Sequence, residues 1–299
     1  MRMDICLSSD DNYAKYMATT MASILLNSNE DEEIYFHLID GGITEENKNK
    51  LLSLKKIKNC EIMFYTPDIE KYNKWYTWGG GTNYKGRFSP AMFYRLNIHL
   101  LIPHNIDRIL YLDCDTIVLK SLKEMFTINF DNKYAIVSDN NNDQSYFNSG
   151  VIMVNARKWR ETNIENEFDN NFYNSNGRVW GDESILNTCL KNKVKFVDKS
   201  YNYIANKIEE SKLKIPYNDI NIIHYISLKP WTSNIKSAIL IDEFWKYYQL
   251  TPWFLERPID AIQTILAQKY SDYEDTKLKI NDIKCFGICL LYTSDAADE

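Results

Sequence analysis

Two carboxylates follow an apolar run near the middle of the chain. Residues 109–112 have the pattern of a buried strand, and Asp113 and Asp115 come directly after it. On extended backbone, side chains two residues apart point to the same side, so both carboxylates can converge beyond the end of the strand. Open α/β sheets bind their ligands there, and such a pair suits a hard divalent cation. A solvated turn is the alternative, but the apolar strand in front of the pair favours a site.

Basic residues in apolar surroundings add to this chemistry. Arg95 lies in the apolar segment 91–96, and a buried guanidinium needs an anionic partner. That partner is either a structural salt bridge or a ligand phosphate or active-site carboxylate. A further apolar strand pattern from residue 222 ends on His224, and Lys229 follows shortly after it.

Polar residues also mark the ends of other elements. Asp10 and Asn12 lie in a loop after the first strand pattern, where they could bind a ribose or base, or merely cap the next helix. Asp139 ends another strand pattern. Asp182 and Glu183 begin a helical segment, and capping would explain them equally well. The small residues at 148–150, just before a strand, predict a close approach of the backbone to another group.

The elements that must position these residues alternate between strands and helices. Strands are expected at 4–9, 33–40, 61–65, 109–112, 134–138 and 151–155, and helices at 14–26, from 44, at 121–126, at 156–174 and from 181. This alternation predicts an α/β fold, with a mainly parallel sheet and helices on both faces. The aromatic and glycine-containing segment 67–88 is interpreted as a loop, and Ser89-Pro90 as the start of a helix.

Composition and charge limit the classes of function. The chain has 299 residues and 44% hydrophobic content, which is enough for a sizeable core. Because 41 acidic residues against 35 basic ones give a net charge of -6, nucleic acid is not expected as a partner. No signal or membrane-spanning pattern is present, so we expect a cytoplasmic protein, with peripheral association at the inner face of the membrane left open. The six cysteines are scattered and are expected to be free, mostly buried thiols.

Taken together, these motifs resemble glycosyltransferase family 8, over roughly residues 3–250. The resemblance rests on an ordered set of short motifs, each weak by itself. They are Ser9-Asp10-Asp11-Asn12-Tyr13, Tyr94-Arg95-Leu96, Leu110-Tyr111-Leu112-Asp113-Cys114-Asp115, Phe147-Asn148-Ser149-Gly150-Val151, Asp182-Glu183-Ser184-Ile185-Leu186-Asn187, and His224-Tyr225 followed by Lys229-Pro230-Trp231.

The resemblance implies a single GT-A domain, the nucleotide-diphospho-sugar transferase fold, at residues 1–250. It also implies transfer of a galactose or glucose from a UDP-sugar to an oligosaccharide or glycolipid acceptor, with retention of anomeric configuration, in lipopolysaccharide or other surface glycan synthesis. Residues 251–280 are expected to form a helical extension, and 281–299 to be a non-native or disordered tail, because the sequence there loses its pattern.

The family's site residues map onto this chain by motif. Asp113, Asp115 and His224 would bind Mn²⁺, or Mg²⁺, bridging the diphosphate of the donor. Further residues would surround that donor: Lys229 and Cys114 near the diphosphate, Asp10 and Asn12 at the uridine, and Arg95, Asp139, Asn148, Asp182 and Glu183 around the transferred sugar.

Two departures from the family and three competing functions remain. The link between His224 and Lys229 is one residue shorter than in many members, and Glu183 stands where galactosyltransferases have Gln, which could alter the mechanism or donor choice. An inverting transferase or a nucleotidyltransferase on a similar fold also uses paired Asp residues. A protein that binds a UDP-sugar without turning it over is the non-enzymatic alternative.

Overall fold

The fold is built on a central sheet of seven strands. The computed structural model describes residues 1–78, 89–139, 144–175, 181–205, 213, 215–226, 229–231 and 238–256. Residues 1–256 form one compact unit. The predictions of a helical extension and a tail beyond residue 256 lie outside the described residues, and Pro252–Glu256 forms a short 3-10 helix.

The sheet is mainly parallel, as expected. Its strand order is β3-β2-β1-β4-β7-β6-β8, and β7 is the strand that runs antiparallel to both of its neighbours. The strands span β1 Arg2–Ser9, β2 Glu33–Asp40, β3 Cys60–Tyr65, β4 Arg108–Leu112, β6 Ala135–Ser138, β7 Val151–Asn155 and β8 Val194–Val197. The predicted strands are therefore present within one or two residues, and β8 was not predicted.

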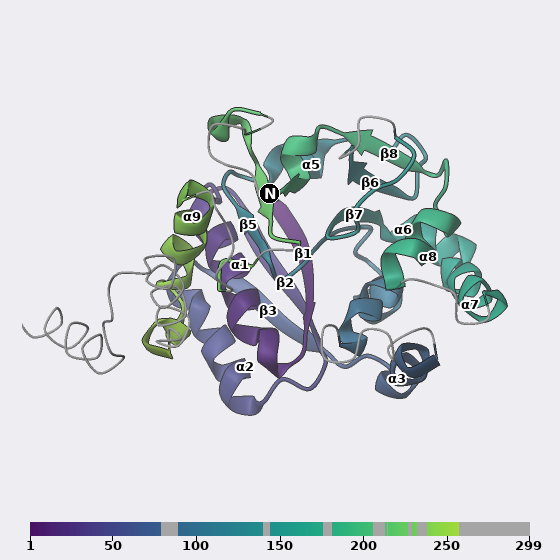
Figure 1. Cartoon of the computed structure of the whole chain (residues 1–299), viewed down its shortest axis with the longest axis horizontal. Helices are drawn as coiled ribbons and strands as arrows, with labels where there is room; N and C mark the ends of the chain where they lie inside the picture. The colour runs from purple at the N-terminus through teal and green to yellow at the C-terminus, as the bar shows by residue number, and fades with distance from the viewer. Residues whose placement is uncertain are drawn as a thin grey trace, which may run out of the picture. The chain divides into compact units, whose positions relative to one another are not determined.

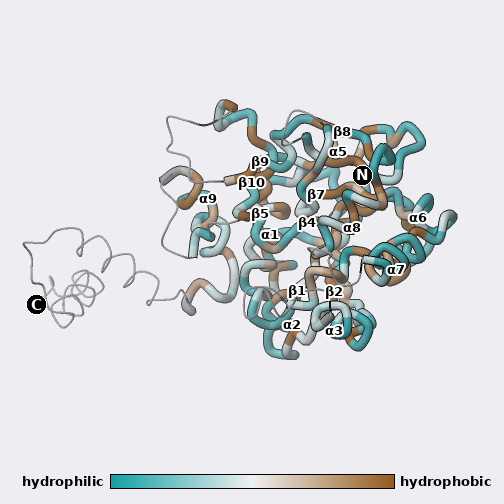
Figure 2. The backbone as a smooth tube through the Cα atoms, turned by 45° about the vertical axis from the view of Figure 1, so that its right-hand side comes forward, coloured by the Kyte–Doolittle hydropathy of each residue, from teal (hydrophilic) through white to brown (hydrophobic). Residues whose placement is uncertain are grey.

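Helices cover the sheet on both faces (Figure 1). They span α1 Ala14–Asn27, α2 Glu45–Leu52, α3 Ile69–Trp78, α4 Ile98–Leu101, α5 Lys123–Thr127, α6 Ala156–Thr162, α7 Ile164–Asn174, α8 Gly181–Cys189 and α9 Ala238–Tyr248. Long hydrophilic stretches run along α2, α6 and α7 (Figure 2). In the described part of the chain, no helix is both long enough and apolar enough to cross a membrane.

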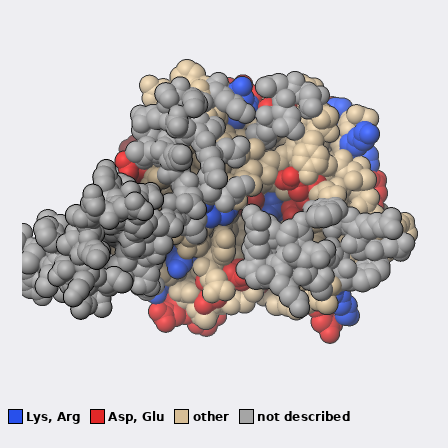
Figure 3. Space-filling model, in the orientation of Figure 1, with Lys and Arg blue, Asp and Glu red and all other residues tan. Residues whose placement is uncertain are grey.

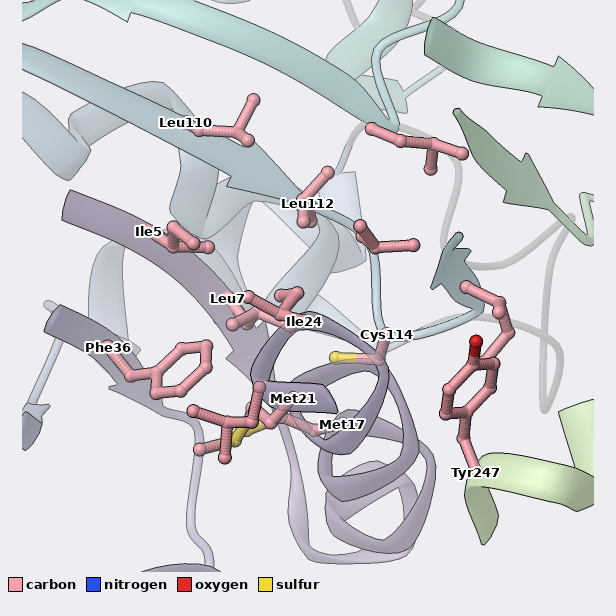
Figure 4. Packing of buried hydrophobic residues seen from close by; sticks show 14 of the residues in the cluster. Ile5, Leu7, Met17, Met21, Ile24, Phe36, Leu110, Leu112, Cys114 and Tyr247 are labelled. Carbon is pink, nitrogen blue, oxygen red and sulfur yellow. The ribbon is translucent and has the colours of Figure 1, made fainter. Parts of the chain in front are cut away.

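Alternate residues of the strands supply two separate cores. Leu110 and Leu112 pack with Ile5, Leu7 and residues of α1 and α9 on one face of the sheet (Figure 4). Their neighbours Ile109 and Tyr111 pack on the other face, against α3, α7 and α8. This alternation follows from the two-residue period of a strand, and it explains why the strands of a sheet buried on both faces are continuously apolar.

The loop predicted for 67–88 is wrong for its first half, because Ile69–Trp78 forms α3. Tyr72 and Trp75 are buried, and they lie three residues apart on one face of the helix. The Trp75 ring stacks on Phe172 of α7 at a centroid distance of 4.1 Å. Aromatic packing between the two helices therefore accompanies a helix that ends before the glycines, and residues 79–88 lie outside the described part.

Two further helix predictions need correction. The single helix expected at 156–174 is divided into α6 and α7 at Asn163, which has a left-handed backbone with φ 48°. Asparagine tolerates this conformation better than most residues. The helix that begins at Pro90 is a 3-10 helix through Asn97 before one turn of α4, and Ser89 makes no side-chain capping hydrogen bond.

A second, three-stranded sheet places His224 beside the two aspartates. Its order is β5-β10-β9, with β5 Thr116–Val118, β9 Tyr203–Ile204 and β10 Ile222–His224. His224 is paired with Thr116 in an antiparallel register, next to Asp115. Pairing of β10 with β5 thus joins residues that are more than a hundred positions apart in the sequence.

Candidate active site

Asp113 and Asp115 lie in a tight turn between β4 and β5. The Thr116 hydroxyl donates to the Asp113 carbonyl at 2.8 Å, and the Asp113 amide donates to the Gly150 carbonyl at 2.8 Å. The expectation that the pair sits on extended backbone is therefore wrong. The two carboxylates nevertheless converge, because the turn folds back on itself and β10 runs alongside.

Three side chains converge as metal ligands would. One ligand atom each from Asp113, Asp115 and His224 lies within 4.8 Å of the others. His224 Nε2 is 3.1 Å from Asp115 Oδ1 and 3.6 Å from Asp113 Oδ2. Asp115 Oδ1 is buried and has no hydrogen-bond partner among the described residues. Because an unsatisfied buried oxygen is costly, a cation bound to this oxygen would satisfy it, and the set fits a divalent metal with oxygen and nitrogen ligands.

Lys229 lies directly beside this cluster. Its ammonium group donates to Asp115 Oδ2 and, at 2.6 Å, to the Tyr225 carbonyl. Burial alone would raise the pKa of Asp115, but His224 and Lys229 outweigh burial and lower that pKa well below the ordinary value. Asp115 is therefore ionised at neutral pH, with one oxygen paired to Lys229 and the other facing His224 Nε2 without a hydrogen bond.

Gly150 provides the space that His224 occupies. A Cβ atom at this position would lie 2.1 Å from His224 Cε1 and 2.7 Å from Asp113 Oδ2. The predicted close approach of the backbone at residues 148–150 is confirmed, and the groups approached are the side chains of His224 and Asp113. Any larger residue at 150 would displace one of them.

Arg95 connects the aspartate pair to the acids of α8. It is 7% exposed, and it binds Asp113 Oδ1 at 2.7 Å and Asp182 Oδ2 at 2.8 Å. It also donates to the Ser149 carbonyl at 2.7 Å. Burial disfavours the charge, but Asp113 and then Asp182 overcome it and raise the pKa of Arg95. The predicted anionic partner is therefore present twice, as carboxylates at the centre of the site.

Asp182 and Glu183 contact the turn before β7. Burial raises the pKa of Asp182 to about 6, against the opposing effect of Arg95. Glu183 accepts hydrogen bonds from Asn148 Nδ2 at 2.7 Å and from the Ser149 amide at 3.0 Å. Its second oxygen accepts one from the Tyr146 hydroxyl at 2.8 Å. The side chains of both acids thus bind other parts of the site. A role in capping alone would have kept them at the N-terminus of α8.

Asn202 is a site residue that the sequence did not reveal. It lies at the end of a 3-10 helix, Lys199–Asn202, and its side chain is fully buried. Asn202 Oδ1 is 2.9 Å from His224 Nδ1, and Asn202 Nδ2 is 3.0 Å from Asn148 Oδ1. The segment has no periodic pattern and no metal-ligand spacing, so a lone asparagine there carries no signal of its own.

The other predicted site residues lie at the margin of this cluster. Asp10 Oδ1 accepts from the Tyr13 amide at 3.1 Å, so the capping interpretation of Asp10 is confirmed, and Asn12 is exposed. Asp139 Oδ1 is buried without a hydrogen-bond partner among the described residues. Within the described ranges, no hydrogen bond or ion pair joins these three side chains to the central cluster. Cys114 donates its thiol to the Ser8 carbonyl at 3.1 Å and points into the core (Figure 4).

The charges of the site are mixed rather than uniformly acidic or basic. Lys229 and Arg95 are interleaved with the carboxylates of Asp113, Asp115 and Asp182. In the face drawn in Figure 3, acidic and basic atoms also lie side by side in a hollow near the middle. Alternating charges of this kind suit a metal together with an anionic group, rather than a polyanionic chain such as nucleic acid.

Known proteins are similar to this chain in sequence. Residues 4–235 match the model of glycosyl transferase family 8. The lipopolysaccharide 1,2-glucosyltransferase of Escherichia coli is 27% identical over 82% of this chain and 77% of its own length. The lipopolysaccharide 1,3-galactosyltransferase of Salmonella typhimurium is 24% identical over 85% of this chain and 77% of its own length.

A solved structure is similar to this chain in fold. Galactosyltransferase LgtC, crystallised with donor and acceptor sugar analogs, superposes with a TM-score of 0.69 at 23% identity, over 84% of this chain and 96% of LgtC. The expected GT-A fold is confirmed by this likeness. Because the family model spans most of the chain, the protein belongs to glycosyltransferase family 8.

Proposed function

We propose that this glycosyltransferase moves galactose or glucose from a UDP-sugar to a glycan acceptor, with retention of anomeric configuration, in lipopolysaccharide or other surface glycan synthesis. The names of the two bacterial relatives support the choice of hexose and pathway. The observation that carries the proposal is the convergence of Asp113, Asp115 and His224, where the buried Asp115 Oδ1 has no hydrogen-bond partner in the described part of the chain.

The same three residues support Mn²⁺ as the cofactor. Carboxylates suit both Mg²⁺ and Mn²⁺, and the imidazole of His224 favours Mn²⁺. The bound cation would supply Lewis-acid stabilisation of the departing diphosphate. Lys229 would add a point charge to the same diphosphate once it exchanges Asp115 for a phosphate oxygen. Asp10 and Asn12 are proposed to bind the uridine, and the backbone at Cys114 to line the diphosphate site, because the thiol itself faces the core.

The transferred sugar is proposed to lie near the acids at the end of the sheet. Asp139 Oδ1 is buried without a hydrogen-bond partner in the part of the chain that the structure describes, so it can accept a hydrogen bond from a sugar hydroxyl. Asp182 and Arg95 would provide the charge that stabilises a cationic anomeric carbon and its leaving group. Retention requires no general base behind the acceptor, because the departing phosphate itself can take the proton of the acceptor hydroxyl.

Asp182 is the carboxylate on which this mechanism depends. Replacing Asp182 by Ala removes a negative charge near the sugar and leaves Arg95 with one carboxylate partner. We expect Asp182→Ala to lose transfer. A variant that folds and transfers at the wild-type rate would place the charge stabilisation elsewhere.

The test is a panel of UDP-sugars with Mn²⁺ present, followed by proton NMR of the first product. We expect release of UDP from UDP-galactose or UDP-glucose, and an α-linked product from the α-linked donor. A β-anomeric coupling at early time would show inversion, which needs a general base. Binding of a donor without UDP release would show a binding protein, and release of hexose 1-phosphate, with the UMP group carried to an acceptor, would show a nucleotidyltransferase.

The acceptor and the location belong to the same proposal. An oligosaccharide or a glycolipid would serve as the acceptor, and we propose a cytoplasmic enzyme that a glycolipid acceptor brings to the inner face of the membrane. Sedimentation with vesicles that contain the acceptor, compared with vesicles that lack it, tests this recruitment. Equal binding to both would separate membrane association from acceptor recognition.

A further inference from the structure

A chain of oriented hydrogen bonds runs from α8 to the metal-ligand cluster. Glu183 Oε2 accepts from Asn148 Nδ2 at 2.7 Å, and Asn148 Oδ1 lies 3.0 Å from Asn202 Nδ2. Asn202 Oδ1 in turn lies 2.9 Å from His224 Nδ1. Asn202 is 0% and His224 2% exposed, so water does not compete for these bonds. We call Glu183, Asn148 and Asn202 the amide relay.

The direction of every bond in the relay follows from two groups whose roles are fixed. The Gly150 backbone amide can only donate, and it donates to Asn148 Oδ1 at 3.0 Å. The Glu183 carboxylate accepts, so the NH₂ group of Asn148 faces it. The carbonyl of Asn148 therefore faces Asn202, which must present its own NH₂ group. This leaves the Asn202 carbonyl facing His224. Because a carbonyl oxygen only accepts, His224 Nδ1 must carry the hydrogen of this bond.

We propose that the amide relay positions His224 as the tautomer with hydrogen on Nδ1, so that the Nε2 lone pair is presented to the metal. Nε2 is the ring nitrogen that faces Asp113 and Asp115, at 3.6 and 3.1 Å. The inference rests on the proposed function of His224 as a metal ligand. Fixing the ring and its tautomer in advance strengthens metal binding, because a hydrogen-bond partner on Nδ1 orients an imidazole that binds a metal through Nε2.

The relay also gives Glu183 a role other than direct contact with the transferred sugar. Its oxygens are occupied by Tyr146, Asn148 and Ser149, all of which are parts of the turn that leads into β7. A Gln at this position can keep its carbonyl toward Asn148 and turn its NH₂ toward the Tyr146 hydroxyl, which can accept. The relay therefore requires an acceptor at residue 183 but no charge. Glu183 is in this account a positioning residue.

The direct test is the tautomer of His224 in the metal-free, full-length, ¹⁵N-labelled protein. A long-range proton–nitrogen spectrum shows which ring nitrogen carries the hydrogen, and His224→Ala assigns the signal among the four histidines of the chain. We expect hydrogen on Nδ1. Absence of hydrogen from Nδ1 in the wild-type protein, with hydrogen on Nε2 alone, would overturn the proposal without any variant.

Variants of Asn202 separate the relay from mere packing. In Asn202→Leu the Nδ1–H tautomer should lose its preference, and Mn²⁺ affinity should fall about 10- to 100-fold. Asn202→Asp keeps an acceptor facing His224 and should retain the tautomer. Asn221→Leu is the matched control, because Asn221 precedes β10 and its side chain donates to Ser200 Oγ at 2.9 Å. Equal Mn²⁺ affinities in Asn202→Leu and Asn221→Leu would overturn the proposal.

Variants of Glu183 and His224 complete the test. Glu183→Gln should keep both the tautomer and the Mn²⁺ affinity, whereas Glu183→Leu should weaken both. Loss of the tautomer in Glu183→Gln would contradict a role that needs no charge. If His224→Ala leaves Mn²⁺ affinity unchanged, the proposed metal site itself fails. If His224→Ala weakens binding but Asn202→Leu does not, the metal site stands and the relay fails.

Discussion

The site contains two pairs of acids that differ in how many of their oxygens the protein itself uses. Asp182 and Glu183 bind Arg95 and the turn before β7 with both side chains. Asp113 and Asp115 also have protein partners, but Asp115 Oδ1 has no hydrogen-bond donor among the described residues and lies 3.1 Å from His224 Nε2. Glu183 receives hydrogen bonds on both oxygens, whereas a buried oxygen without a donor points to a ligand. We therefore propose metal binding for the second pair, a supporting role for Glu183 and an electrostatic role at the sugar for Asp182.

The largest effect is expected at Asp115, whose buried Oδ1 has no hydrogen-bond donor among the described residues. Asp115→Asn should lower kcat by on the order of 10²-fold or more with the fold intact, because one ligand and its charge are lost. UDP release and thermal unfolding measure the two quantities separately. A fully active Asp115→Asn enzyme would show that Asp115 is not a ligand of a catalytic metal and serves only in the turn.

Gly150→Ala should have the next largest effect. Its Cβ would collide with His224 and Asp113, which gives a ligand displacement without changing any charge. We expect Mn²⁺ affinity to fall about 10- to 100-fold, as for the loss of an orienting partner. Titration of Mn²⁺ followed by electron paramagnetic resonance checks this. Gly42→Ala is the control, because a Cβ atom at residue 42 would meet nothing within 4 Å. Its φ of 106° adds backbone strain without a collision.

Asp182 should also be visible in the stability of the protein. The pKa of Asp182 is raised to about 6 in the folded chain, above its ordinary value. Protonation therefore favours the folded state, and the contribution of Asp182 is complete below about pH 4 and is lost as the pH rises through 6.

Asp182→Asn removes this dependence in the metal-free protein. The stability of the wild type relative to the variant should fall by on the order of 2–3 kcal/mol between pH 4 and 7. Urea unfolding at several pH values measures the difference. Parallel pH profiles for the two proteins would show that Asp182 does not have the raised pKa.

The smallest effect is expected at Glu183 Oε1, the oxygen that accepts from Tyr146. Tyr146 is 42% exposed, and its hydroxyl donates the one hydrogen bond that Glu183 Oε1 receives from the described residues. Tyr146→Phe should lower the free energy of unfolding by about 1 kcal/mol or less, and leave Mn²⁺ affinity unchanged. A loss of Mn²⁺ affinity in Tyr146→Phe would show that the two acid pairs are coupled more closely than the contacts indicate.

Much of the scaffold could be predicted because its signals are local. β1, β2 and β7 are apolar runs that lie in a sheet covered on both faces, and Thr44 caps α2 through the Asn47 amide, as the acids after it indicated. α3 was missed because its stability comes from the stacking of Trp75 on Phe172, a contact between residues about a hundred positions apart.

The centre of the site is harder to predict, for the same physical reason. Asp113, Asp115 and His224 were identified as ligands from the resemblance, but the turn that brings the aspartates together is visible only in the structure. Asn202 could not be found, because its role depends on the pairing of β9 with β10. Residues with a local pattern are predictable, whereas residues defined by a distant partner are not.

The metal dependence of UDP release tests the central claim most directly. Removal of divalent cations with a chelator should stop UDP release from the preferred UDP-hexose. Mn²⁺ should restore it better than Ca²⁺, because Ca²⁺ prefers six to eight oxygen ligands and the site offers an imidazole with two carboxylates. Full activity in the presence of the chelator would contradict the assignment of Asp113, Asp115 and His224 as the ligands of a catalytic cation.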